Sequence, residues 1–370
     1  MVGSVYVGGG TGKNNCVLYD LKFIQISGGD HLLVASGDPG IVIYKWTHFE
    51  AAIAIAMDDG EACLSPKKAK CQDPSSIQQP DVIKPITSFQ PHPSPATSFG
   101  ESVEINCTSY NESDGILFGA SGDVFGFYQW DLSTERLLGA FAGASRFDGG
   151  GHRDYLHVVK AIPENGMSSR YVITGGEDGN MGFWDGKNRK LIEMINIQTS
   201  MDKNKDLVTC NTTSNNRSFM SSSSTPWNNG SNLWVSSVDT RGNWLAVCGG
   251  AENTNNISLT SRSSPSTSGF ATLWHLPSRT FTSGCVTRES LNTVVYSDSL
   301  GCFVSGGNEG RISFWESTTM VRSGRSWSSP PATYTISADP ESSTMVVGGS
   351  GGILDCFADR VKVSQLQLSS

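Results

Sequence analysis

The chain has 370 residues. Glycine accounts for 41 of them, about 11% against a usual share of about 7%, and charged residues for only 17% against a usual share of about 25%. This balance favours many turns and few solvated helices. The formal net charge of −8 argues against a protein that coats nucleic acid over its whole surface, because such binding needs clustered lysine and arginine.

No membrane-spanning or secretory segment is expected. The longest apolar stretch, residues 51–57, is much shorter than the roughly 20 residues that a spanning helix needs. The first twelve residues have neither a basic start nor an apolar signal core. The nine cysteines include no CxxC spacing, and several lie in strand-like apolar runs, which predicts buried, reduced thiols.

One phrase recurs along the chain: an apolar run, a small Gly/Ser pair, a tight turn, and a second apolar run that ends in an aromatic residue. Clear copies span 32–46, 116–131, 171–185 and 303–316, and looser copies span 245–276 and 345–357. Each copy predicts two strands joined by a tight turn. The closing aromatic residues are Trp46, Trp130, Trp184, Trp274, Trp315 and Phe357.

The spacing of these aromatic residues indicates the architecture. The last two intervals are 41 and 42 residues, which matches the roughly 40–45 residues of a WD40 repeat. We therefore predict an all-β fold, a single WD40-type β-propeller domain over residues 1–370 with six recognisable blades. Residues 1–15 hold one further phrase, VYVGGGTG, which we interpret as a remnant of another blade.

Longer intervals coincide with polar insertions at residues 58–100, 200–230 and 251–269. Such segments contain too little apolar surface to offset the entropy of ordering them. We expect them to be disordered loops that project from the ring, and sustained helical periodicity is found nowhere.

The copy at 171–185 is the most complete. A Gly-His pair precedes it and a Trp-Asp pair ends it, which is the GH…WD signature of WD40 blades. In such blades a buried hydrogen-bond chain commonly joins four residues, here His152, Thr174, Asp178 and Trp184. We predict this structural tetrad for one blade only, because Glu309 replaces the aspartate in another copy and no second Gly-His pair exists.

The sequence contains no assembled catalytic site. The glycine-rich start, GGGTGKNN, fails the phosphate-loop pattern at two positions. His152 and His157 flank Asp154, but no further ligands stand nearby at metal-binding spacing. We therefore expect no catalytic residue, cofactor, metal or small-molecule substrate.

A short basic run contains Lys67, Lys68 and Lys70. It fits a nuclear localisation signal and a solvated loop equally well. Both interpretations stay open.

Three passages resemble the THO complex subunit 6 family of WD40 proteins: GHRDYLH at 151–157, TGGEDGNMGFWD at 174–185, and WLAVCGG at 244–250 followed by ATLWHL at 271–276. The resemblance implies a seven-bladed propeller in the nuclear THO/TREX assembly, which couples transcription to mRNA packaging and export. It implies other THO/TREX subunits as partners. The net charge of −8 suits protein contacts better than direct RNA binding, so we expect RNA to be contacted indirectly or weakly. The short N-terminus and the long polar insertions depart from the family.

A second binding role has its own residues. The segment 172–187 also resembles the WDxR box of WD40 substrate receptors of the DDB1–cullin 4 ubiquitin ligase. In that alternative, Asp185 and Lys187 would face the adaptor. An enzyme with its site in the central channel is a third hypothesis, to which no polar cluster can be assigned from the sequence.

Overall fold

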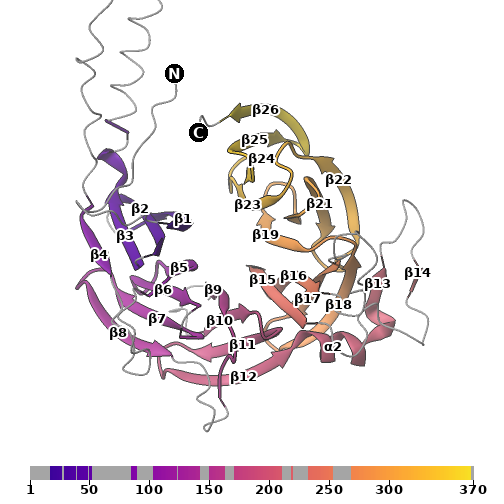
Figure 1. Ribbon diagram of the computed structural model, residues 1–370, viewed down its shortest axis with the longest axis horizontal. Coiled ribbons are helices and arrows are strands. Elements are labelled where there is room, and N and C mark those ends of the chain that lie inside the picture. Colours follow the sequence, from indigo (N-terminus) through magenta and orange to yellow (C-terminus); the bar gives the residue numbers. More distant parts are fainter. Residues whose placement is uncertain are drawn as a thin grey trace, which may run out of the picture.

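The computed structural model describes residues 17–26, 29–38, 40–48, 50–51, 85–89, 103–122, 124–141, 150–162, 171–210, 218–219, 232–252 and 268–367. They form six sheets around a central axis, as Figure 1 shows. The predicted all-β propeller with six blades is thereby confirmed. Within the described ranges, no helix is long and apolar enough to cross a membrane.

Five of the sheets have four strands each, and their neighbours in the sheet follow chain order. The first sheet contains β1 (Val17–Gln25), β2 (His31–Asp38), β3 (Gly40–Lys45) and β4 (Thr87–Phe89). The second contains β5 (Cys107–Asn111), β6 (Ile116–Ser121), β7 (Gly126–Asp131) and β8 (Arg136–Phe141). The third contains β9 (Leu156–Ala161), β10 (Tyr171–Gly176), β11 (Asn180–Asp185) and β12 (Lys190–Asn196).

The fifth sheet contains β19 (Leu291–Ser297), β20 (Cys302–Gly307), β21 (Arg311–Glu316) and β22 (Arg322–Trp327). The sixth contains β23 (Thr333–Ala338), β24 (Thr344–Gly349), β25 (Ile353–Ala358) and β26 (Val361–Gln367). In each of these five sheets the first strand lies nearest the axis and the last lies at the rim (Figure 1).

The fourth sheet has six strands. Its main part contains β15 (Asn232–Arg241), β16 (Trp244–Glu252), β17 (Ser268–His275) and β18 (Thr280–Thr287). Two short strands, β13 (Val208–Cys210) and β14 (Ser218–Phe219), extend its outer edge, where β13 pairs in parallel with β18. A helix, α2 (Ile197–Lys203), and a single 3₁₀ turn, η2 (Lys205–Leu207), lead from β12 to β13.

The recurring phrase of the sequence corresponds to the middle two strands of a sheet. In the third sheet, for example, β10 and β11 pair antiparallel from Tyr171↔Asp185 to Gly175↔Met181. Gly179, with φ of 67°, lies in the tight turn between them. Five closing aromatic residues are almost completely buried on the third strands of their sheets: Trp130, Trp184, Trp274, Trp315 and Phe357.

The small residue pairs of the phrase lie where neighbouring sheets approach most closely. A Cβ atom added at Gly175 would be 2.4 Å from Cγ1 of Val235 on the next sheet. One added at Gly306 would be 2.4 Å from Cγ2 of Thr333, again on the next sheet. Glycine is therefore required here because only a residue without a side chain leaves room for the neighbouring sheet.

Each junction between successive sheets is filled by one apolar cluster. There are five such clusters, one at each junction from that between the first and second sheets to that between the fifth and sixth. A sixth cluster, around Leu33, Ala35 and Tyr44, belongs to the first sheet alone. Among the described residues, no cluster joins the sixth sheet to the first.

The expectation of disordered loops was wrong for parts of the three insertions. The range 58–100 contains β4, which pairs with β3 through Ile41↔Phe89 and supplies the outer strand of the first sheet. The range 200–230 contains the end of α2, η2, β13 and β14. The range 251–269 begins inside β16 and ends inside β17. Residues 1–16 and 52–84 lie outside the described residues, and with them the N-terminal phrase and Lys67, Lys68 and Lys70.

The ordered part of the second insertion contributes to the core. Met201 and Val208 are each 1% exposed and belong to the cluster between the third and fourth sheets. A few apolar residues are sufficient to order this part of the polar segment, because β13 can pair with the outer edge of β18. The average composition of the segment does not reveal these few apolar residues.

Val208→Ala is therefore expected to lower the free energy of unfolding by about 1.5 kcal/mol, since it removes two buried methyl groups worth about 0.8 kcal/mol each. Urea denaturation monitored by tryptophan fluorescence measures the change. Leu207→Ala is the matched control, because Leu207 is 45% exposed and its truncation should leave the midpoint unchanged. Equal midpoints for the two variants would show that β13 does not pack against the core.

Candidate functional site

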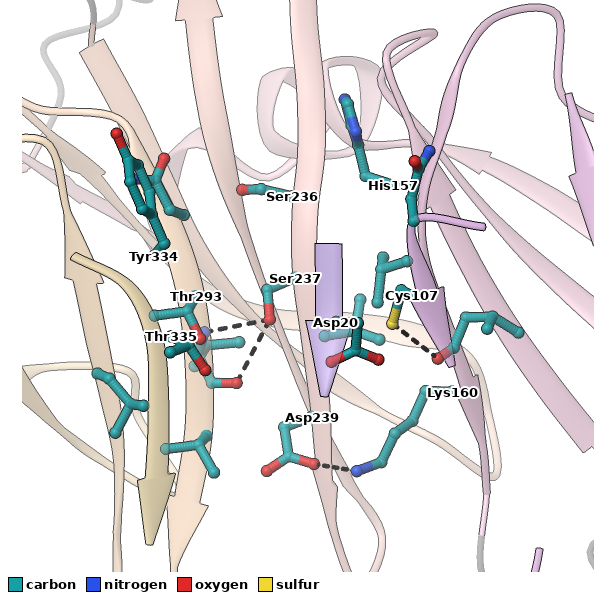
Figure 2. A pocket seen from close by; sticks show the side chains of 18 of the residues that line it. Asp20, Cys107, His157, Lys160, Ser236, Ser237, Asp239, Thr293, Tyr334 and Thr335 are labelled. Atoms are coloured by element: carbon teal, nitrogen blue, oxygen red, sulfur yellow. Dashed lines mark hydrogen bonds and ion pairs between the residues drawn. The ribbon is translucent and has the colours of Figure 1, made fainter. Parts of the chain in front are cut away.

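The innermost strands of all six sheets line a cavity of about 270 Å³ on the axis of the ring. Its wall is mostly polar, and Figure 2 shows its side chains. Asp20 and Lys22 lie on β1, Cys107 on β5, Lys160 on β9 and Asp239 on β15. This cavity, the central channel, is the candidate functional site.

Asp20 links the first sheet to the second. Its Oδ2 accepts hydrogen bonds from the backbone N of Thr108 at 2.7 Å and from Thr108 Oγ1 at 2.9 Å. Lys22 Nζ lies 3.8 Å from the same oxygen. Burial would lower the pKa of Lys22, but the negative charges of Asp20 and Asp239 outweigh it and the pKa is raised. Lys22 is therefore a permanent cation here, not a base or a nucleophile.

Asp239 links three sheets. Its Oδ1 lies 2.6 Å from Lys160 Nζ on β9, as the dashed line in Figure 2 shows. Its Oδ2 accepts a hydrogen bond from the backbone N of Tyr296 on β19 at 2.7 Å. The Asp239 side chain is only 12% exposed and that of Lys160 is 32% exposed, so water screens this pair less than a surface pair.

Other polar side chains of the inner strands also bind the backbone of the next sheet. Asn106, just before β5, donates from Nδ2 to the carbonyl of Leu156 at 2.8 Å. Asn292 on β19 donates to the carbonyl of Thr333 at 2.9 Å. The carboxylates and amides of the channel therefore already serve to fasten neighbouring sheets together.

Cys107 lines the channel, and a cysteine is a nucleophile when its thiol is ionised. Burial raises the pKa of its thiol, and its Sγ donates to the carbonyl of Val159 at 3.7 Å. A thiol held in its neutral form is a poor nucleophile. Among the described residues, no group of three or more His, Cys, Asp or Glu side chains is placed to hold a metal ion.

The structure brings together the four residues of the predicted tetrad. His152 Nδ1 lies 3.0 and 3.1 Å from the two carboxylate oxygens of Asp178, and its Nε2 lies 2.7 Å from Thr174 Oγ1. Trp184 Nε1 donates to Thr174 Oγ1 at 2.8 Å. Because a carboxylate only accepts, Nδ1 carries the proton, and Nε2 then accepts from the threonine hydroxyl.

Asp178, the carboxyl group at one end of this hydrogen-bond network, is held in its charged form. Burial opposes the charge on Asp178, but the hydrogen bonds from His152, Asn180 and the backbone N of Arg153 lower the pKa of Asp178 below its ordinary value. His152 and Thr174 are both completely buried. The network therefore satisfies its members inside the third sheet and leaves none of them directed at a ligand.

Two other sheets contain shortened versions of this network. Trp274 Nε1 donates to Thr272 Oγ1 at 3.0 Å, and Trp315 Nε1 donates to Ser305 Oγ at 2.9 Å. The sequence signature, which requires His and Asp, missed both pairs. A hydroxyl residue ten positions before the tryptophan identifies the second, as it does Thr174 before Trp184.

Of the residues of the alternative adaptor contact, Asp185 ends β11 and Lys187 lies in the turn that leads to β12. Asp185 is 6% exposed. Its Oδ1 accepts from the backbone N of Lys187 at 3.1 Å and of Asn188 at 2.9 Å. Asp131 caps the equivalent turn of the second sheet by accepting from Ser133 N at 2.8 Å. The Trp-Asp sequence is therefore explained by turn formation, while Lys187 is exposed.

A buried carboxyl group that no sequence motif marks lies between the fourth and fifth sheets. Glu289 is 7% exposed, and its Oε2 accepts from the backbone N of Glu309 at 2.9 Å. Burial, together with the negative charge of Glu309, raises the pKa of Glu289 to about 7. Arg311 and Arg325 oppose this shift without cancelling it.

This group predicts a pH dependence of stability. A carboxyl whose pKa is higher in the folded state loses stability as pH rises from its ordinary value, 4.5, through about 7. Glu289→Gln keeps the acceptor and removes the charge, so the variant should be more stable than the parent at pH 8, by about 2 kcal/mol. Urea denaturation at pH 5 and pH 8 should show the difference at the higher pH only. The same difference at both values would refute the assignment.

Curated proteins named THO complex subunit 6 are similar to this chain. The Arabidopsis thaliana protein is 29% identical over 181 residues, which cover 49% of this chain and 41% of that protein. The Mus musculus and Homo sapiens proteins are each 26% identical over 264 residues, which cover 70% of this chain and 61% of theirs. The resemblance identified from the sequence is thereby confirmed.

The match is partial in length. The chain spans between 41% and 61% of these relatives. No protein-family model matches the chain.

Proposed function

We propose that this protein is a non-catalytic scaffold subunit of a THO/TREX-like complex that acts in mRNA processing and nuclear mRNA export. The observation that carries the proposal is the likeness over 264 residues to mammalian proteins named THO complex subunit 6, on a propeller of six sheets. Propellers of this kind commonly bind other proteins over broad faces, with about 800 Å² buried per partner.

The chemistry of the channel supports a non-catalytic role. Asp20 and Asp239 are occupied by backbone N–H groups and by lysines. Lys22 is held as a cation, and Cys107 as a neutral thiol. General acid–base catalysis needs a group whose pKa lies near the working pH, and these shifts move both groups away from it.

The proposed partners are the other subunits of the THO/TREX assembly, and the proposed location is the nucleus. The assembly as a whole carries the RNA, so in this role the chain contacts RNA indirectly or weakly. The DDB1–cullin 4 alternative is less favoured, because Asp185 caps its own turn.

Affinity purification of the tagged full-length chain from nuclear extract, followed by mass spectrometry, tests the assembly. THO subunits should co-purify in near-stoichiometric amounts. The matched control is Lys187→Ala, which removes the exposed side chain of the alternative contact and should leave THO recovery unchanged. DDB1 and cullin 4 in place of THO subunits, lost in Lys187→Ala, would overturn the proposal.

Depletion of the protein in cells tests the process. Polyadenylated RNA should accumulate in the nucleus, and re-expression of the full chain should restore export. A cytoplasmic protein, with normal export after depletion, would contradict the proposed role.

A further inference from the structure

The outer strand of the fifth sheet, β22, carries an exposed tryptophan among arginines. Trp327 is 69% exposed, the largest exposure among the large hydrophobic side chains of the described residues. Arg322 and Arg325 lie on the same strand, whose sequence is RSGRSW. Figure 1 shows β22 at the rim of the ring, where it is reachable from solvent.

The pairing of β22 with β21 places Arg325 and Trp327 on one face, and a register shift at Phe314/Trp315 brings Arg322 opposite Trp315. Trp327 lies opposite Arg311, Arg325 opposite Ser313, and Arg322 opposite Trp315. Residues directly opposite on antiparallel strands share a face, and alternate residues of a strand return to it. Trp315 packs in the cluster with the fourth sheet, so the arginines and Trp327 lie at the outer margin of that junction.

The tryptophan ring is already held by one of these cations. The guanidinium carbon of Arg311 lies 4.6 Å from the centre of the Trp327 ring. Such a contact is favourable where the ring face meets a cation. It orients the ring at the surface, where 69% of the Trp327 residue surface is exposed to solvent.

Positive charge exceeds negative charge at this place. Arg311 pairs with Glu309 at 3.1 Å. Within the described ranges, neither Arg322 nor Arg325 has a carboxylate at ion-pair distance. Burial and the neighbouring Arg311 lower the pKa of Arg325, and the negative charges of Glu289 and Glu309 oppose this shift without cancelling it. Glu289 carries only part of a negative charge at neutral pH, because burial raises its pKa to about 7.

We propose that this patch, formed by Arg311, Arg322, Arg325 and Trp327, binds single-stranded nucleic acid. Arginine recognises phosphate oxygens with two parallel N–H donors. An exposed aromatic ring stacks a base, and this combination is how many proteins hold single strands without sequence preference. An acidic peptide would satisfy the arginines but leaves the tryptophan without a partner. The patch is local, which reconciles it with the net charge of −8.

This inference is independent of the proposed function, because it concerns the isolated chain and not its assembly. Fluorescence anisotropy with labelled oligouridylate, oligothymidylate and polyglutamate, on the purified full-length protein at 50 mM salt, tests it. We expect oligonucleotide binding in the micromolar range. The logarithm of affinity should fall with the logarithm of salt with a slope of about −2, as for three phosphate contacts on a single strand. The RNA and DNA arms show which sugar is preferred.

Trp327→Ala and Arg325→Gln should each weaken oligonucleotide binding about tenfold. Two controls match them in type and exposure. Tyr334→Ala removes an aromatic residue that is 59% exposed on β23. Arg241→Gln removes an arginine that is 57% exposed on β15. Both controls should bind as the parent does, and thermal melting confirms that every variant is folded.

Two results would overturn the proposal. One is oligonucleotide binding that is absent or unchanged in Trp327→Ala and Arg325→Gln. The other is polyglutamate binding as tight as that of the oligonucleotides and insensitive to Trp327→Ala, which would identify the patch as a site for acidic protein segments.

Discussion

Trp184→Ala is expected to lower the free energy of unfolding by about 4 kcal/mol, within the usual range for truncation of a buried tryptophan. The ring packs edge to face on Phe127 and Phe141 of the second sheet, with centroid distances of 5.3 and 6.0 Å. The change leaves a cavity between the second and third sheets. It also leaves Thr174 Oγ1 without its indole donor. Since a typical domain is stable by about 5–15 kcal/mol, the loss should be visible as a large drop in melting temperature.

Trp327→Ala provides the comparison, because it removes the same side chain from a position that is 69% exposed. Its melting temperature should stay within a degree or two of the parent protein. Urea denaturation gives the free energies for both variants. A Trp184→Ala protein that melts with the parent would show that neither the junction nor the hydrogen-bond network is formed in solution.

Asp239→Ala is expected to cost about 3 kcal/mol. The change leaves the backbone N–H of Tyr296 without its acceptor and the ammonium group of Lys160 without its carboxylate partner. Removing one member of a largely buried pair is costly, because the remaining group is desolvated without compensation. The effect should be read in urea denaturation at neutral pH.

An exposed ion pair serves as the control for the Lys160–Asp239 pair of the channel. Arg241 and Asp298 are 2.7 Å apart, but their side chains are 57% and 39% exposed. Asp298→Ala should therefore cost less than about 1 kcal/mol, as is usual for exposed pairs. If the two aspartate variants are equally stable, the Asp239 pair does not fasten the inner strands.

Much of the fold was predictable because its elements are local. A strand pair with a tight turn is written in some fifteen consecutive residues, and the spacing of Trp274, Trp315 and Phe357 gives the length of a repeat. The tetrad was accessible for the same reason, since its signature is a short motif with fixed spacing. The strand β4 was missed because it is three residues long and follows a long polar stretch.

The channel was not predictable, and the reason is geometric. Asp20, Lys160 and Asp239 stand alone in three strands that are far apart in sequence, and nothing in their neighbours marks them. Only the closing of successive sheets around one axis brings Lys160 to within 2.6 Å of Asp239. The basic patch on β22 was predictable only in part. RSGRSW was readable as basic and aromatic, but the contribution of Arg311 depends on strand register.

The junctions between sheets determine how the molecule should come apart. Each of the second to fifth sheets takes part in two of the clusters that join neighbouring sheets, whereas among the described residues the first and sixth sheets each take part in one. In a linear array stabilised by nearest-neighbour contacts, the terminal units open first and the middle units open last. Amide protons of β25 should therefore exchange with solvent before those of β11, although both are third strands of their sheets. The sixth sheet would then open partially under conditions in which the middle sheets are still folded.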